Sequence, residues 1–187
     1  MSYRCHLIDR NDENAAALRA TLSNDPRCEV HSGRYQNVLP GLVSQIRGRP
    51  YGLIYLDPNG QPDFDFITQL SQDSALSRVD FLIHFTATGL KRARRITDGA
   101  TLEDRLRQIN KQLWMIAPVT EGSPWQWTFL IGLNYRMKPY EKMGFVYIDS
   151  DRGERLLYEI NYTKDEKDAI PPKDQLILSD FFGRGIV

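Results

Sequence analysis

The sequence has few cysteines, no long apolar run and no net charge. Cys5 and Cys28 are its only cysteines and lack CxxC or metal-type spacing, which predicts two free thiols and leaves one disulfide as the alternative. No apolar run approaches the roughly 20 residues that cross a bilayer, and the segment Met1–His6 has no signal-peptide core. We therefore expect a cytoplasmic protein without membrane contact.

The positive and negative charges of the chain balance, so its net charge indicates no class of partner. The chain contains 24 Lys and Arg residues against 24 Asp and Glu residues, so bulk electrostatics favour no polyanionic partner. Only a local basic cluster could indicate nucleic acid, and one is present at Lys91, Arg92, Arg94 and Arg95. This cluster predicts a phosphate-binding surface, and the alternative is a solvated turn.

The 187 residues are enough for one domain with a real core, and their first half alternates between strand and helix signals. Apolar segments that predict strands alternate with segments of helical periodicity, and the predicted strands cover residues 3–8, 28–31, 52–56 and 79–85. Such alternation predicts a parallel sheet with helices on both faces.

The second half begins with a helix and predicts a hairpin. Thr101 and Asp104 form a capping-box-like start, and Leu102, Leu106, Ile109 and Leu113 follow as an apolar stripe. Ser123 and Pro124 predict a second helix start, continued by Trp125, Trp127, Phe129 and Leu133. Residues 144–148 and 156–162 predict an antiparallel hairpin, because every second residue from 156 to 162 is apolar or aromatic and would face the same side of a strand. We expect one domain over residues 1–164, then a linker and apolar tail over 165–187 that docks on the domain or a partner.

The most informative stretch is a buried strand, residues 52–56, that runs into an acidic turn made of Asp57, Pro58, Asn59 and Gly60. An acid at the carboxyl end of a parallel strand lies where open α/β sheets bind ligands. The alternative is a structural turn in which Asp57 accepts hydrogen bonds from the amides of Asn59 or Gly60.

Other catalytic or metal signatures are weak. His84 lies at the end of a buried strand and is interpreted as a hydrogen-bonded core residue. His6 and His31 have no acidic or cysteine partner at metal-type spacing, so the sequence predicts no metal site. No serine or cysteine lies in a nucleophile elbow.

The strand order, the acid after the first strand and the Asp57-Pro58-Asn59-Gly60 turn resemble class I, Rossmann-like methyltransferases, and among them the three-Cys-motif partner family. The resemblance covers residues 3–164. It implies an α/β fold with a mostly parallel sheet, a C-terminal antiparallel hairpin and no counterpart of the first strand and helix. It also implies S-adenosylmethionine as cofactor and nucleic acid as the modified substrate.

Carried over residue by residue, the resemblance makes Asp57 to Gly60 the catalytic turn and Asp9 the contact to the cofactor ribose. Arg34 and Tyr35 would lie at the adenine, but Arg34 stands where the family often has an acid, and arginine cannot accept a hydrogen bond. The Gly-rich loop that approaches the cofactor has no counterpart. The sequence thus predicts a methyltransferase-family protein related to nucleic-acid modification. A non-catalytic binding or scaffold module is the alternative, and a homodimer would cover the sheet position of the missing strand.

Overall fold

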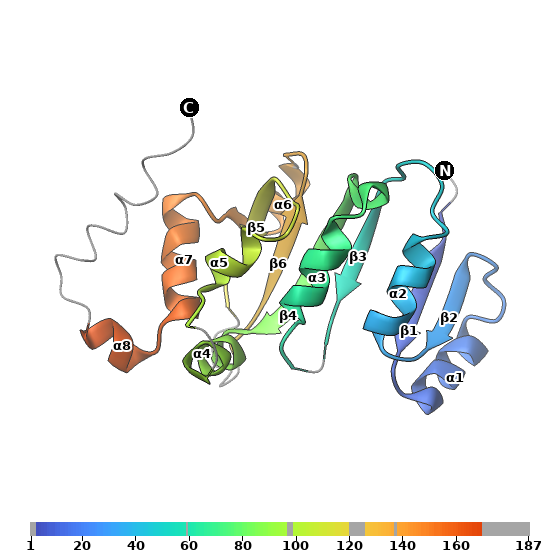
Figure 1. Ribbon diagram of the computed structural model, residues 1–187, viewed down its shortest axis with the longest axis horizontal. Helices are drawn as coiled ribbons and strands as arrows, with labels where there is room; N and C mark the ends of the chain where they lie inside the picture. Colours follow the sequence, from blue (N-terminus) through green and yellow to red (C-terminus); the bar gives the residue numbers. More distant parts are fainter. Residues whose placement is uncertain (1–2, 59, 97–98, 120–125, 137, 170–187) are drawn as a thin grey trace. The chain divides into compact units, whose positions relative to one another are not determined.

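A computed structural model describes residues 3–58, 60–96, 99–119, 126–136 and 138–169 (Figure 1). The chain divides into two compact units, which we call the N-terminal unit (Met1–Pro50) and the C-terminal unit (Tyr51–Val187). Within the described ranges, no helix is long and apolar enough to cross a membrane.

The N-terminal unit is a β-α-β-α segment (Figure 1). Its elements are β1 (Cys5–Asp9), α1 (Asp12–Thr21), β2 (Cys28–Ser32) and α2 (Tyr35–Val43). β1 and β2 pair in parallel along their whole length. The side chain of Asn11 accepts hydrogen bonds from the amides of Glu13 and Asn14, so α1 begins where the sequence predicts its cap.

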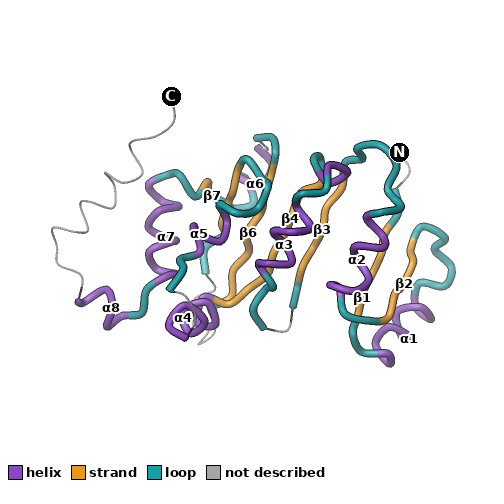
Figure 2. Tube along the Cα trace, in the orientation of Figure 1, coloured by secondary structure: helices purple, strands orange, loops and turns teal. Residues whose placement is uncertain are grey.

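The C-terminal unit contains a five-stranded sheet in the order β3-β4-β6-β5-β7 (Figure 2). Its strands are β3 (Gly52–Leu56), β4 (Val79–Thr86), β5 (Leu113–Ile116), β6 (Trp127–Leu133) and β7 (Val146–Tyr147). Its helices are α3 (Phe64–Ser71), α4 (Ala87–Ile96), α5 (Leu102–Leu106), α6 (Lys138–Lys142), α7 (Asp151–Asn161) and α8 (Lys164–Ala169), with a 3-10 turn at Ser74–Leu76.

The chain is α/β as predicted, but the prediction of a mostly parallel sheet was wrong. Only β3 and β4 run parallel in the five-stranded sheet, whereas β6 is antiparallel to both β4 and β5, and β7 is antiparallel to β5. A parallel connection needs about a dozen or more residues. Residues 117–126, which separate β5 from β6 in the sequence, are fewer than that.

The predicted C-terminal hairpin was also wrong. β7 is short, and residues 151–161 form helix α7. Gly153, Leu157 and Ile160 are buried at helical spacing, and this burial outweighs the apparent alternation of residues 156–162. The hydroxyl of Ser150 accepts a hydrogen bond from the amide of Gly153, and this N-cap starts the helix.

Two further predictions concern the helix expected over residues 123–133 and the apolar tail. Trp127 to Leu133 form strand β6 and not the predicted helix, while Ser123, Pro124 and the tail residues 176–182 lie outside the described residues. The predicted capping box of Thr101 and Asp104 is confirmed at α5, but the helix ends at Leu106, and Leu113 belongs to β5.

The core of the C-terminal unit lies on both faces of its sheet. In Figure 1, α3 and α5 cross in front of the strands, and side chains from both helices are buried together with Phe81, Ile83 and Phe85 of β4. Met115 and Ile131 belong to a second cluster that includes Phe145 and contacts Leu82 and Phe129. Because side chains alternate along a strand, these two residue sets occupy opposite faces.

Candidate functional site

Asp57 lies directly after β3 and faces a histidine of the neighbouring strand. Leu56 pairs with Ile83, so the next register position brings Asp57 beside His84. The imidazole Nδ1 of His84 lies 2.7 Å from Oδ1 of Asp57, and the hydroxyl of Tyr55 donates to Oδ2 at 3.0 Å. The carboxylate therefore has two fixed partners within the C-terminal unit.

His84 is held by rings as well as by the carboxylate. Its ring stacks against Trp127 at 4.7 Å and against Phe129 at 4.4 Å between centroids. The His84 side chain is 19% exposed, whereas the Asp57 side chain is 52% exposed. The imidazole of His84 thus holds in place a carboxylate that still reaches solvent. The predicted hydrogen bond of His84 is present.

Tyr55 completes this group, which we call the Asp57 centre (Tyr55, Asp57 and His84). Burial and the hydrogen bond to the Asp57 carboxylate raise the pKa of the Tyr55 hydroxyl. The phenol therefore stays protonated and remains a donor at neutral pH. Half of the Tyr55 side chain is exposed, so its ring also presents an aromatic surface next to the acid.

The turn after Asp57 is joined to the start of α4. The amide of Gly60 donates to the carbonyl of Pro58 at 2.8 Å, so that amide does not form the turn to Asp57 that the structural alternative expects. The side chain of Gln61 donates to the carbonyl of Thr86 at 3.0 Å. A Cβ atom at Gly89 would lie 2.1 Å from Nε2 of Gln61, so the Gln61 side chain would have to move if residue 89 were not glycine. Asn59 lies outside the described residues.

Helix α4 carries the predicted basic cluster and divides it into two pairs. Arg94 forms an ion pair with Glu166 and stacks on the ring of Tyr162 at 4.7 Å. Nζ of Lys91 donates to Oε1 of Gln126 at 3.0 Å, and burial lowers the pKa of the Lys91 ammonium. These two cations are therefore engaged within the C-terminal unit.

Arg92 and Arg95 form the second pair, and both are exposed. Together with Lys91 they line a surface hollow of about 500 Å³, whose other lining residues are Thr88, Ile96 and Thr163. We call this feature the basic hollow. Three cations around one concave surface create a local positive potential in a chain whose net charge is zero.

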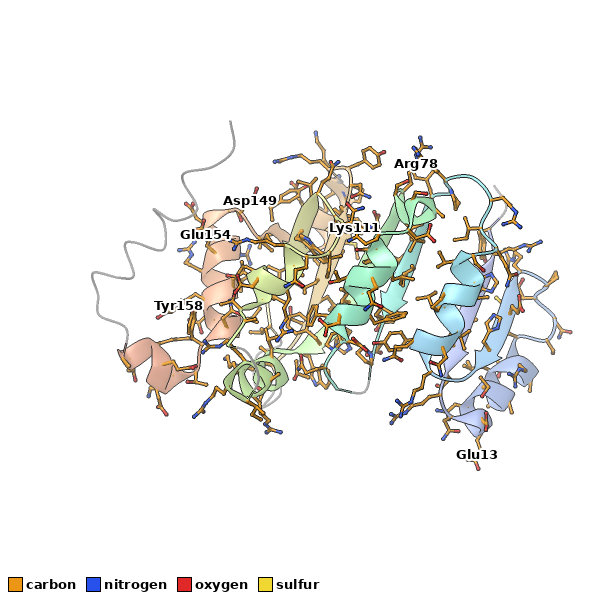
Figure 3. All side chains as sticks on the ribbon, viewed as in Figure 1. Glu13, Arg78, Lys111, Asp149, Glu154 and Tyr158 are labelled. Atoms are coloured by element: carbon orange, nitrogen blue, oxygen red, sulfur yellow. The ribbon has the colours of Figure 1, made fainter. Side chains whose placement is uncertain are left out.

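A larger hollow of about 1110 Å³ lies along α5 and α7, where Figure 3 labels Glu154 and Tyr158. Its lining contains none of the residues that the sequence singled out as a site. The acids Glu103 and Asp151 line it together with Arg107 and Arg155, so its charges are mixed.

The predicted cofactor residues lie in the N-terminal unit. The Asp9 carboxylate accepts hydrogen bonds from the amide of Asn11 at 2.7 Å and from the side chain of Asn14 at 3.4 Å. Arg34 is the N-cap of α2 without a side-chain cap bond, and Tyr35 is the first residue of that helix. Asp9 therefore already orders the loop into α1.

The structure also assembles a group that the sequence did not predict. Glu29 lies within 4 Å of both His6 and His31, so the expectation that these histidines lack an acidic partner was wrong. The signal was the parallel register, which aligns His6 with Glu29 and Ile8 with His31. Local spacing in the sequence carries no such information.

The chain matches no protein-family profile, and no curated protein is similar enough to count as a relative.

Proposed function

We propose that the C-terminal unit binds single-stranded nucleic acid, with phosphates in the basic hollow and a base at the Asp57 centre. The observation that carries this proposal is that three cations line one hollow on α4, the helix that directly follows the strand bearing His84. Hydrogen bonds of Gln61 to Thr86 join the acidic turn to the same helix start.

The basic hollow supplies the affinity in this proposal. Arginine side chains match phosphate oxygens with several donors in a fixed fork. The side chains of Arg92 and Arg95 are exposed and line the hollow, so both can present their donors to a phosphate. Lys91 contributes less, because its partly buried ammonium already donates to the side chain of Gln126.

The Asp57 centre supplies selectivity for a base. An ionised carboxylate has about four acceptor positions, of which His84 and Tyr55 use two. The remaining positions suit an exocyclic amino group such as that of cytosine or adenine. A phosphate would be repelled there, and the exposed ring of Tyr55 offers a surface for stacking.

Fluorescence anisotropy with a labelled single-stranded oligonucleotide of mixed sequence tests the proposal. We expect R92Q/R95Q to lower the affinity about tenfold and to reduce the salt slope by about 1 to 2, because each phosphate contact releases counterions. The matched control K138Q/K142Q removes two exposed charges from α6 and should change neither quantity.

A second variant separates base contact from phosphate contact. D57N should weaken binding about fivefold to tenfold, as expected for the loss of one good base contact, and leave the salt slope unchanged. If the parent protein does not bind at low salt, or R92Q/R95Q binds as the parent does, the proposal is wrong.

S-adenosylmethionine, the cofactor implied by the resemblance, does not fit the residues at the corresponding positions. Arg34 offers donors where the adenine amino group needs an acceptor, and the sequence has no counterpart of the Gly-rich loop that approaches the cofactor. We therefore derive no methyl-transfer step. Calorimetric titration should show weak or no binding, and a low-micromolar dissociation constant would restore the methyltransferase as the better proposal.

A further inference from the structure

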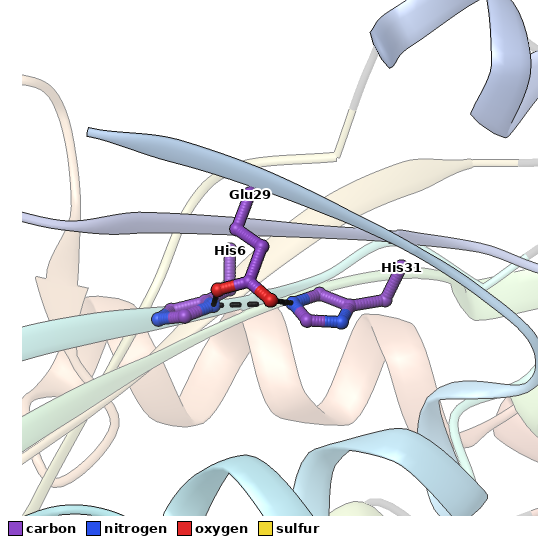
Figure 4. A group of neighbouring side chains, drawn as sticks. All are labelled: His6, Glu29 and His31. Atoms are coloured by element: carbon purple, nitrogen blue, oxygen red, sulfur yellow. Dashed lines mark hydrogen bonds and ion pairs between the residues drawn. The ribbon is translucent and has the colours of Figure 1, made fainter. Parts of the chain in front are cut away.

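Two histidines and a glutamate converge on one face of the β1–β2 pair (Figure 4). His6 belongs to β1, and Glu29 and His31 belong to β2. Paired residues of parallel strands face the same side, and so do residues two apart on one strand. The register His6 to Glu29 therefore places all three side chains together.

The distances between the potential ligand atoms are short and nearly equal. Nδ1 of His6 lies 3.2 Å from Nε2 of His31. The Glu29 carboxylate lies between the rings in Figure 4, with one oxygen 3.6 Å from Nδ1 of His6 and the other 3.7 Å from Nε2 of His31.

The 3.2 Å between the two nitrogens is close to the separation of ligands around a tetrahedral ion, and the two Glu29 distances, each to a different oxygen, are slightly longer. Ligands that bind Zn²⁺ at about 2.0–2.1 Å with tetrahedral angles lie about 3.3 Å apart. We propose that His6, Glu29 and His31 form a site for one Zn²⁺ ion, with His6 Nδ1, His31 Nε2 and a Glu29 oxygen as ligands.

The ligand chemistry and the exposure of the group support a zinc ion with an open position. Two imidazoles and one carboxylate form a common zinc ligand set, and three protein ligands leave a fourth position for water. The side chains of Glu29, His6 and His31 are 65%, 35% and 18% exposed, so an ion can enter from solvent.

The two thiols need a separate control. Cys5 and Cys28 are free and are register partners on the same strand pair. Their positions are offset by one residue from His6 and Glu29, so they belong to the other face of the strands. Thiolates are also strong zinc ligands, and binding is therefore best measured in the C5S/C28S chain.

Isothermal titration of the full C5S/C28S chain with zinc chloride is the test. We expect one Zn²⁺ ion per chain. H6N and H31N should each weaken binding at least about tenfold, because loss of even an outer contact to a zinc ligand costs that much. E29Q, at the most exposed of the three positions, should also weaken it while leaving the fold intact.

A control variant makes the assignment specific. E13Q removes an exposed carboxylate from α1, outside the cluster. It should bind Zn²⁺ as tightly as the C5S/C28S parent. Equal loss in E13Q and E29Q would indicate unspecific binding to surface carboxylates and overturn the proposal.

Cobalt gives a readout of geometry that affinity does not. Co²⁺ bound in the zinc site should give the intense visible bands of tetrahedral coordination, and these should vanish in H31N. The proposal is also overturned if the wild-type chain binds Zn²⁺ and the C5S/C28S chain does not. It is equally overturned if H6N, H31N and E29Q all bind as the parent does, since the His6–His31 contact would then be only a hydrogen bond.

Discussion

The Asp57 centre and the His6–Glu29–His31 cluster both combine an acid with histidine on a pair of parallel strands, and they differ in what surrounds these groups. In the Asp57 centre the imidazole is wedged against Trp127 and Phe129, and its Nδ1 is committed to the acid at 2.7 Å. In the cluster, two imidazole nitrogens and one carboxylate lie close together on an exposed surface.

This difference shows that an acid beside a histidine does not by itself determine which ligand a site binds. Where aromatic rings fix the imidazole, as at His84, the acid is oriented and remains the group that meets a ligand. Where two imidazoles converge, as at His6 and His31, a nitrogen of one ring faces a nitrogen of the other, an arrangement that suits a cation. Four predictions break or sharpen this comparison.

The largest expected effect is on stability. H84A should reduce the free energy of unfolding of the C-terminal unit by about 2–3 kcal/mol, because it removes a stacked ring and leaves Asp57 and the aromatic side chains without their contact. H6A should change that of the N-terminal unit by less than about 1 kcal/mol, because His6 is exposed. Urea unfolding followed by tryptophan fluorescence measures the first, and hydrogen exchange of β1 and β2 measures the second. Equal costs would contradict the distinction.

The second prediction concerns zinc. At a zinc concentration 100 times the dissociation constant, stabilisation by binding is about 2.7 kcal/mol. Amides of β1 and β2 that exchange by unfolding of the N-terminal unit should therefore exchange up to about a hundredfold more slowly. The C-terminal unit of the same sample is the internal control, and its β4 amides should not change. Slower exchange in both units would contradict a site confined to the cluster.

The third prediction compares the two acids. D57A should cost about 1 kcal/mol, because it leaves the Nδ1 of a mostly buried His84 and the Tyr55 hydroxyl without their acceptor. D57N keeps an acceptor oxygen and should cost less. Without zinc, E29A should stay within about 0.5 kcal/mol of the parent, as exposed positions do. If D57A costs no more than E29A, His84 does not depend on its acid.

Much of the fold could be predicted because apolar runs and turn residues mark it. The strands through β4 and the cap of α5 follow from local signals. Strands β5 and β6 were missed, because the apolar residues from Leu102 to Leu113 and from Trp125 to Leu133 were interpreted as helix stripes. Helix α7 was missed because residues 156–162 also alternate, although the N-cap residue Ser150 was a usable signal.

The candidate sites were predictable only to the level of single residues. The position of Asp57 after a buried strand is visible in the sequence, but its pairing with His84 depends on the register of β3 and β4. The cluster of His6, Glu29 and His31 depends on the register of β1 and β2 in the same way. Register is fixed by which side chains pack into the core, and that is a tertiary property.

The smallest expected effect concerns a third acid, Glu103, which differs from both because it is partly buried. Burial raises the pKa of Glu103, although the side-chain amide of Asn161 donates to it at 2.6 Å. Between the ordinary glutamate pKa and this raised value, the folded state binds more protons than the unfolded state, so the free energy of unfolding falls as pH rises.

E103Q has no charge to bury and should lack this slope. It should match the parent near pH 4 and exceed it by less than about 1 kcal/mol at pH 7, as measured by urea unfolding at both pH values. E141Q, on the exposed face of α6, should behave as the parent at both. A lower stability of E103Q at pH 7 would mean that the hydrogen bond to the charged carboxylate outweighs its burial, and that Glu103 is held by its partner as Asp57 is.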